Sequence, residues 1–288
     1  MDENLTRSKR DHLRRIWSDA SVIPDSADWS LLTGGRTNLI WRVDMPDGSS
    51  LVCKLFRPNT ATPLFANDGT REALALRALA GSYIAPELVA FQDSTFGETV
   101  IYRHIDGLPW GGDVVTVARV MARLHARGLP EGLPEQTVTP NSLIADGHNM
   151  APSGLILPPT LPQSLPDARR AFLHGDIVPG NLLDTSDGLQ LIDWQCPSIG
   201  DPSADIAIFL SPAMQVLYGH RALSSTEIDL FLSAYQVESG DSQTVARYRA
   251  LAPLYHWRMA TYCLWKSTRG DRDYARVATL ELDALEQA

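Results

Sequence analysis

Three polar residues stand in a fixed order between short apolar runs in the second half of the 288-residue chain. Asp176 and Asn181 lie within the stretch from Phe172 to Leu183, and Asp193 directly follows the run Leu189–Ile192. The apolar runs are typical of short buried strands, and the Pro-Gly pair inside the first stretch is typical of a tight loop. We therefore expect the chain to return on itself here, so that the three polar side chains converge.

The types of these side chains indicate a particular chemistry. Transfer of a phosphoryl group to a hydroxyl needs a carboxylate that orients and deprotonates the acceptor, together with oxygen ligands for Mg²⁺. Asp176 suits the first role, and Asn181 and Asp193 suit the second. Each residue alone has an ordinary explanation as a turn or a helix cap. The compound pattern His-Gly-Asp-x4-Asn, followed by Asp-Trp, favours the catalytic explanation.

This pattern resembles the phosphotransferase family that includes aminoglycoside phosphotransferases, choline kinases and bacterial thiamine kinases, over residues 32–209. The resemblance implies an α+β, bilobal, protein-kinase-like fold with a small β-rich N-terminal lobe and a larger, mainly helical C-terminal lobe. We place the nucleotide-binding lobe with its hinge at residues 1–104 and the catalytic, acceptor-binding lobe at 105–288. The resemblance also implies ATP and Mg²⁺ as cofactors, Asp176 as catalytic base, and Asn181 and Asp193 as metal ligands.

A glycine pair precedes the second predicted strand of the N-terminal third. Backbone amides beside Gly34 and Gly35 can approach phosphate closely because glycine has no Cβ. A plain hairpin turn is the ordinary explanation of such a pair. The run from Gly34 to Asn38 resembles the Gly-Gly-x-Thr-Asn loop of choline and thiamine kinases, which implies that Gly34, Gly35 and Asn38 contact nucleotide phosphates.

Lys54 lies in an otherwise apolar predicted strand, where an ammonium group without a partner would be costly to bury. A bound phosphate and Glu72, at the start of a predicted helix over 70–79, would both serve as partners, as in the lysine and glutamate pair of kinases. The alternatives are an exposed Lys54 and a Glu72 that merely complements the helix dipole.

The strand predicted from Glu98 leaves into a linker that the resemblance identifies as the hinge, where backbone groups of Arg103, His104 and Ile105 meet the adenine. A core helix is predicted over 113–127. Residues 130–166 hold eight of the nineteen prolines and show little helical period. We expect an irregular segment there, either a surface loop or one wall of the acceptor pocket.

Aromatic residues at helical spacing mark the C-terminal region. A stripe at helical spacing, typical of a helix core, is formed by Leu254, Trp257 or Arg258, Thr261 or Tyr262, and Trp265. Its aromatic residues Trp257, Tyr262 and Trp265 are also candidates for contact with the acceptor. The resemblance offers another role, because choline-kinase-like enzymes place aromatics from this part of the chain around a quaternary ammonium. Asp205 follows Asp193 after twelve residues, too few for the peptide platform of a protein kinase, and the resemblance implies that it hydrogen-bonds the catalytic loop.

Composition excludes several classes of protein. A net charge of −9 argues against nucleic acid as a partner, since phosphate contacts need a basic face. No stretch of the sequence is long and apolar enough for a membrane span, and the start carries no apolar signal-peptide core. Three cysteines, without metal-ligand spacing, favour a reducing compartment, so we expect a cytoplasmic protein.

The sequence thus predicts an ATP- and Mg²⁺-dependent kinase for a hydroxyl of a small molecule, with an amine-bearing alcohol of choline or thiamine type preferred. The alternatives are a kinase for aminoglycosides, other sugars or amino acids, and a nucleotide-binding regulatory protein without turnover. Gln195 and Cys196 depart from the glutamate and aromatic that choline and thiamine kinases carry there. The acceptor, ATP versus GTP and the oligomeric state stay open.

Overall fold

The computed structural model describes residues 3–32, 37–150 and 156–287. Its helices and strands follow along the chain as α1 (Glu3–Asp19), β1 (Asp28–Leu31), β2 (Leu39–Asp44), β3 (Ser50–Leu55), α2 (Gly69–Ala78), β4 (Leu88–Ser94), β5 (Gly97–Arg103), β6 (Leu108–Pro109), α3 (Val114–His125), β7 (Glu135–Gln136), α4 (Pro140–Met150), β8 (Ala171–Leu173), the 3₁₀ turn η1 (Pro179–Asn181), β9 (Leu182–Thr185), β10 (Gly188–Leu191), β11 (Ser198–Gly200), α5 (Ser203–Leu210), α6 (Pro212–Leu217), α7 (Ser225–Ser239), α8 (Ser242–Ser267) and α9 (Asp273–Gln287).

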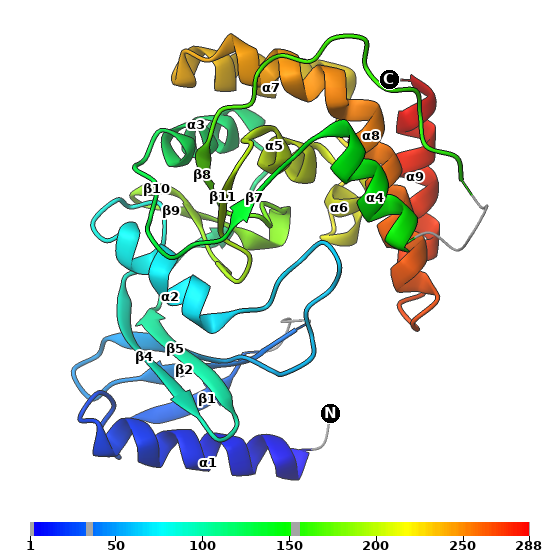
Figure 1. Cartoon of the computed structure of the whole chain (residues 1–288). Helices are drawn as coiled ribbons and strands as arrows, with labels where there is room; N and C mark the ends of the chain where they lie inside the picture. The colour runs from blue at the N-terminus through cyan, green and yellow to red at the C-terminus, as the bar shows by residue number, and fades with distance from the viewer. Residues whose placement is uncertain (1–2, 33–36, 151–155, 288) are drawn as a thin grey trace.

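An antiparallel sheet with strand order β1-β2-β3-β5-β4 forms the N-terminal lobe. β3 is its central strand and is covered on both faces. Leu51, Cys53 and Leu55 join a core with Trp17 of α1, which lies along the outer face of the sheet at the bottom of Figure 1. Because side chains alternate along a strand, Lys54 lies on the opposite face, on the side of α2.

The C-terminal lobe is mainly helical, with α8 and α9 side by side and α4 against α8 (Figure 1). One hydrophobic core runs through it and continues into the sheet. That core joins Val52 and Val100 of the sheet to Val117 of α3, Phe209 of α5 and Phe231 of α7. The α+β fold with a β-rich N-terminal part and a helical C-terminal part, as predicted from the sequence, is confirmed.

Two small sheets bring the predicted catalytic segments together. β9 and β10 form an antiparallel hairpin, in which Leu182 pairs with Leu191, and β8 pairs antiparallel with β11. The connections from β8 to β9 and from β10 to β11 therefore run beside each other. Asp176 lies in the first connection and Asp193 in the second, so the convergence expected from the apolar runs is present.

The prediction of an irregular segment over 130–166 is wrong at α4. This helix begins at Pro140, which suits the first position of a helix because no backbone N–H is needed there. It carries Gly147 in its interior and lacks a regular apolar stripe, so the sequence pattern hides it. Gly147 is required by packing, because a Cβ at this position would overlap the ring of Trp257 in α8.

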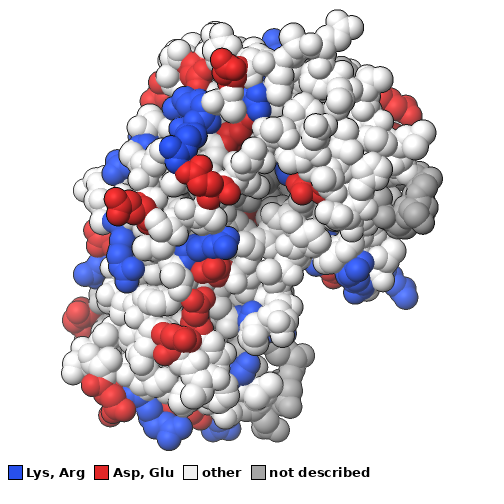
Figure 2. All heavy atoms as spheres, viewed as in Figure 1, with Lys and Arg blue, Asp and Glu red and all other residues white. Residues whose placement is uncertain are grey.

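Charged side chains of both signs are interspersed over the face shown in Figure 2, without an extended basic area. None of the helices within the described ranges combines the length and the apolar character needed to cross a membrane.

Substitution of Gly147 by Ala tests the contact between α4 and α8. Alanine normally stabilises a helix interior by about 0.5–1 kcal/mol relative to glycine. Here the added methyl group meets the buried Trp257 ring, and overpacking of this kind costs about 1–3 kcal/mol. We therefore expect Gly147→Ala to lower the free energy of unfolding, measured by chemical denaturation. Gly128→Ala, outside the helices, is the control for adding a methyl group without overlap, since its Cβ would enter open space. A Gly147→Ala protein as stable as wild type would contradict this packing.

Candidate active site

The loop between β8 and β9 carries Asp176 and Asn181 at the bottom of the cleft between the lobes. Asn181 ends the turn η1 and donates its amide Nδ2 to the Asp176 backbone carbonyl at 2.9 Å and to its carboxylate at 3.2 Å. Only 6% of Asp176 is exposed. Burial, and then the charge of Asp193, raise the pKa of the Asp176 carboxyl to about 8, against the opposing hydrogen bond from Asn181.

Asp205 holds this loop from below, as predicted. Its carboxylate accepts the backbone N–H groups of His174 at 2.9 Å and Gly175 at 2.8 Å, and contacts His125 Nε2 at 3.1 Å. Burial favours the neutral form of Asp205, but the hydrogen bond from His125 and the other donors outweigh it and lower the pKa. An ionised, wholly buried carboxylate thus fixes the backbone just before Asp176.

His174 contributes to the architecture of the same loop. Burial lowers the pKa of its ring, which favours the neutral form. Its Nδ1 accepts the backbone N–H of Asp176 at 3.2 Å, so Nε2 is the protonated nitrogen and donates to the Ile192 carbonyl at 3.0 Å. The ring therefore joins the loop that carries Asp176 to the residue that precedes Asp193.

Asp193 follows β10 and adopts a left-handed backbone conformation with φ of 63°, which is uncommon for a residue other than glycine. Its carboxylate forms an ion pair with Lys54, whose ammonium group also lies 2.5 Å from Glu72 Oε2. Burial alone would lower the pKa of Lys54, but the charges of Asp193 and Glu72 outweigh it and raise the pKa. The predicted pairing of Lys54 with Glu72 is confirmed.

A cavity of about 340 Å³ opens beside these groups, on the side of the sheet. It is lined by Val52, His104, Ile105, Asn181 and Asp193, among others. Two of the three predicted hinge residues, His104 and Ile105, therefore line a cavity that also contains apolar residues of the sheet and the candidate metal ligands.

The third predicted hinge residue, Arg103, turns its side chain to the surface, where it pairs with Glu87 at 3.1 Å. Its predicted contact would be made by backbone groups. Gly34 and Gly35 lie outside the described residues. Asn38 is buried, and it bonds Gln195 and Asn67.

A second cavity, of about 600 Å³, meets the first at Asp176 and Gln195, which line both. Tyr262 and Tyr274 line its far side, together with Asp271 and Asp273. Asp176 therefore borders two cavities. The first is lined by the candidate nucleotide-binding residues, and the second by aromatic and acidic side chains together with the basic residues Arg57 and Lys266.

The three aromatic residues predicted to contact the acceptor have different surroundings in the structure. Tyr262 lines the second cavity. Trp265 stacks beside Tyr262, and the guanidinium group of Arg269 lies 4.0 Å from the centre of its ring. Trp257 is wholly buried between α4 and α8, where it packs on Gly147 and is not among the residues that line this cavity.

The connection between β3 and α2, residues 56–68, contributes to the second cavity and was not predicted as part of the site. This loop reaches from the sheet to the helices, where Thr62 lies 3.3 Å from the Tyr262 hydroxyl and the Phe65 ring packs edge-on against Tyr262. Aromatic and hydroxyl residues in a loop carry no pattern that points to a partner 200 residues away.

Two buried polar contacts were also missed. Asn38 Nδ2 donates to Gln195 Oε1 at 3.1 Å, which bridges the N-terminal sheet and the segment after Asp193. Asp201 accepts the Ser203 N–H at 2.9 Å and also forms a buried ion pair with Arg247 of α8. The one signal in the sequence that could have indicated this pair is an arginine, Arg247, within the predicted helical region, where a buried charge needs a partner.

Comparison with known proteins matches residues 28–253 to the phosphotransferase enzyme family. The chain is similar in structure to a choline/ethanolamine kinase family protein from Mesorhizobium loti, with a TM-score of 0.67 and 16% identity over 96% of this chain and 94% of that one. Choline kinase LicA from Streptococcus pneumoniae gives a TM-score of 0.63 at 17% identity, over 98% and 100%.

An amicoumacin kinase in complex with AMP-PNP and Ca²⁺ gives a TM-score of 0.60 at 11% identity, over 97% of this chain and 96% of that one. Comparison with curated protein sequences gives no significant match. The resemblance inferred from the motifs around Asp176 is confirmed by the family match, which covers most of the chain. The chain therefore belongs to the phosphotransferase enzyme family, and the solved structures share its fold.

Proposed function

We propose that the chain transfers the γ-phosphoryl group of ATP to a hydroxyl of a small, amine-bearing alcohol. The observation that carries this proposal is the meeting of the 340 Å³ and 600 Å³ cavities at Asp176. ATP would occupy the first, with adenine near His104 and Ile105 and the phosphates near Lys54. The acceptor would occupy the second, with its hydroxyl at the Asp176 carboxylate.

The residues present fit a divalent cation. Asn181 donates through its amide nitrogen to Asp176, and no described residue donates to its oxygen Oδ1, which is thus available as a ligand. Asp193 offers the second carboxylate oxygen beyond the one that Lys54 engages. Mg²⁺ held by these two oxygen donors would offset negative charge on the nucleotide phosphates. The amicoumacin kinase of similar fold binds a nucleotide analogue and Ca²⁺, which supports a nucleotide and a divalent cation as ligands here.

Asp176 would orient the acceptor hydroxyl and take its proton as the oxygen attacks phosphorus. The pKa of its carboxyl, raised to about 8, suits a general base, because such a base works best when its pKa lies near the working pH. Lys54 would hold phosphate oxygens in line, and Glu72 would keep the ammonium group in place. Asp205 would act as a positioning residue, because its carboxylate fixes the backbone that precedes Asp176.

The preference for an amine-bearing acceptor rests on the second cavity. The ammonium group of Lys266 already lies 5.3 Å from the centre of the Tyr274 ring and 2.5 Å from Asp271. A cation between an aromatic face and a carboxylate is thus already part of this wall, which supports the proposal of an amine-bearing acceptor. Tyr262 and Asp273 line the same cavity and would offer an aromatic ring and a carboxylate to the acceptor.

A regulatory protein that binds nucleotide without turnover is the rival proposal. It would require no base at the junction of two cavities, and Asp176 is placed there. Release of ADP in the presence of a panel of amine-bearing alcohols, aminoglycosides, other sugars and amino acids separates the two. Nucleotide binding without ADP release for any acceptor would favour the regulatory protein.

Replacement of Asp176 by Asn tests the proposed base. We expect Asp176→Asn to lower kcat by about 10²- to 10⁴-fold, the usual contribution of a positioned general base, while nucleotide affinity stays near that of wild type. Steady-state kinetics and nucleotide titration measure the two effects. Asp187→Asn, on an exposed turn in the same region, is the control and should keep full turnover. Full turnover by Asp176→Asn would remove the residue from the mechanism.

Substitutions of Asp193 and Lys54 should differ in how they change the Mg²⁺ dependence of ATP binding. Asp193→Ala is expected to abolish Mg²⁺-dependent ATP binding, because a carboxylate ligand is lost beside the phosphates. Lys54→Met should weaken ATP binding without changing the Mg²⁺ titration. Calorimetric titration of ATP at several Mg²⁺ concentrations compares the two variants. An unchanged apparent Mg²⁺ affinity in Asp193→Ala would assign the metal to other residues.

Leucine substitutions test which aromatic ring meets the acceptor. A cation over an aromatic face gains about 0.5–2 kcal/mol, so Tyr262→Leu should raise the acceptor KM about two- to thirty-fold and leave the ATP KM unchanged. Trp265→Leu should change it less, because Arg269 already covers that ring. Trp257→Leu should lower stability with acceptor KM unchanged. If a neutral isostere of the acceptor shows the same KM as the amine in wild type, the cationic pocket is excluded.

A further inference from the structure

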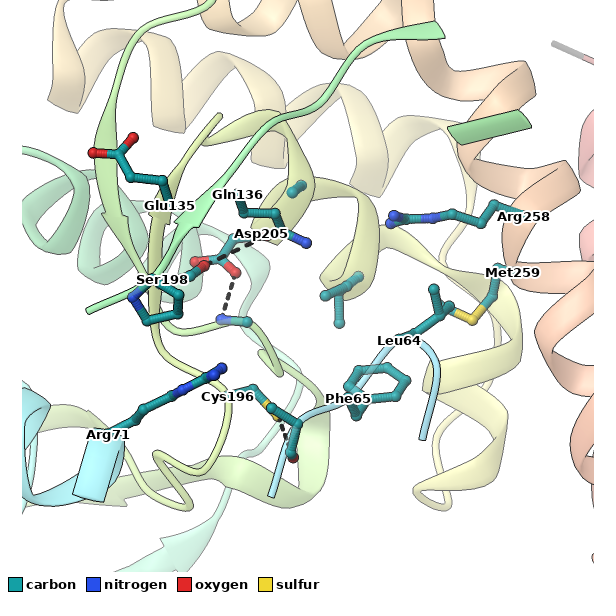
Figure 3. A pocket seen from close by; sticks show the side chains of 15 residues that line it. Leu64, Phe65, Arg71, Glu135, Gln136, Cys196, Ser198, Asp205, Arg258 and Met259 are labelled. Atoms are coloured by element: carbon teal, nitrogen blue, oxygen red, sulfur yellow. Dashed lines mark hydrogen bonds between the residues drawn. The ribbon is translucent and has the colours of Figure 1, made fainter. Parts of the chain in front are cut away.

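A third cavity, of about 220 Å³, lies behind the catalytic loop (Figure 3). Gly175 and Cys196 are among its lining residues, and each is next in the sequence to a residue, Asp176 or Gln195, that lines both the nucleotide and the acceptor cavity. Phe65 and Ala66 line both this cavity and the acceptor cavity, so they form a wall between the two. The proposed reaction uses neither of the two arginines, Arg71 and Arg258, that line this third cavity.

Arg258 enters this cavity from α8 (Figure 3). Its side chain is 8% exposed, and its Nη1 lies 3.2 Å from the carboxylate of Asp146, which is 44% exposed. The Tyr255 ring supports the guanidinium group at 5.4 Å. A guanidinium group has five N–H donors, and no described residue accepts a hydrogen bond from Nε or Nη2 of Arg258. A buried cation therefore keeps donors available toward the cavity.

Arg71 enters the cavity from the opposite side, from α2 of the N-terminal lobe (Figure 3). Its Nε lies 3.0 Å from Asp68, three residues earlier, in an ion pair that is about one-third exposed. Such pairs contribute little and exchange readily, so Arg71 can turn donors to a ligand. Figure 3 also shows the amide nitrogen of Gln136 directed into the same space, while its oxygen lies 3.4 Å from the Ser198 hydroxyl.

The two carboxylates that border the cavity are already engaged. Asp205 is bound by two backbone N–H groups and by His125. Glu135 pairs with Arg170 and turns its carboxylate away from the cavity in Figure 3. The groups that remain for a ligand are N–H donors, of which those of Arg71 and Arg258 carry positive charge.

We propose that this cavity binds a small anion with a phosphoryl or carboxylate group, held between Arg71 and Arg258. Planar guanidinium groups bind both kinds of group through paired hydrogen bonds. At about 220 Å³ the cavity is smaller than the roughly 300–1,000 Å³ of sites for larger ligands. It is larger than one water molecule requires, which suits a small anion rather than a second nucleotide.

The position of Arg71 gives the anion a route to the active site. Arg71 precedes Glu72 on α2, and Glu72 holds Lys54. An anion bound to both arginines would tie α2 to α8 and so limit movement of Glu72 relative to the C-terminal lobe. This regulatory consequence rests on the proposed function, whereas binding of the anion does not. We expect the bound anion to lower the KM for ATP a few-fold, in the range usual for coupled sites.

Calorimetric titration of the full chain tests the binding site. ADP and Mg²⁺ are added first at saturating concentration, so that the phosphate positions beside Lys54 are filled. Inorganic phosphate and succinate are then titrated separately, with chloride balancing the ionic strength. We expect one saturable site for at least one of them. Preference for phosphate indicates a phosphoryl ligand, and preference for succinate indicates a dicarboxylate.

Three variants decide whether the site is the one between the arginines. Arg258→Met and Arg71→Met should each weaken the affinity by about tenfold or more, the effect of losing a charge-assisted hydrogen bond. Arg249→Met removes the same charge from an exposed position of α8 and should leave the affinity unchanged. Arg71 is partly exposed, so its variant keeps the test valid if Arg258→Met fails to fold.

The proposal is overturned if neither anion shows saturable binding to wild type, or if both arginine variants bind as wild type does. It is also overturned if Arg249→Met loses affinity equally, because the binding would then follow net charge. Failure of ADP to bind in the first step would count against the proposed kinase function alone, and the anion titration still reports on the cavity.

Discussion

The buried ammonium group of Lys54 fixes three separate parts of the chain at one point. β3 supplies the lysine, α2 supplies Glu72 and the segment after β10 supplies Asp193. An uncompensated charge at this depth would cost on the order of several kcal/mol, so the two carboxylates must lie close to it. The Phe56 ring, 4.8 Å from the ammonium nitrogen, covers a further side. The position of α2 and that of the metal-ligand candidate therefore depend on the same cation.

A second buried charge, on Asp205, holds the C-terminal side of the site. Its hydrogen bonds from His174 and Gly175 fix the backbone that leads into Asp176, and His125 joins it to Tyr235 of α7. Fully buried carboxylates are tolerated when several donors surround them. The loop that carries Asp176 is therefore held by the helical core as well as by its own turn.

The sequence predicted the parts of this site in which chemistry and local pattern agree. Lys54 and Glu72 could be paired because a lone cation in an apolar strand needs an anion. The helix α4 could not be predicted, since its glycine and proline weaken the periodic signal and its place depends on contact between Gly147 and Trp257, 110 residues apart. The same contact keeps Trp257 in the core, whereas Tyr262, five residues later and about 140° further around α8, lines the second cavity. Periodicity assigns a residue to one face of a helix but does not tell what covers that face.

Gln195 shows why a neutral side chain suits the junction of the two cavities. It lies close to Asp176 and Asp193, and the charge of Asp193 already helps to raise the pKa of the Asp176 carboxyl. A third carboxylate at this position would add repulsion and make Asp176 still harder to ionise. The amide instead accepts a hydrogen bond from Asn38, which is itself paired with Asn67 through reciprocal amide bonds of 2.7 and 3.0 Å. The glutamine thereby joins the sheet to the segment that follows Asp193 without adding charge beside the proposed base.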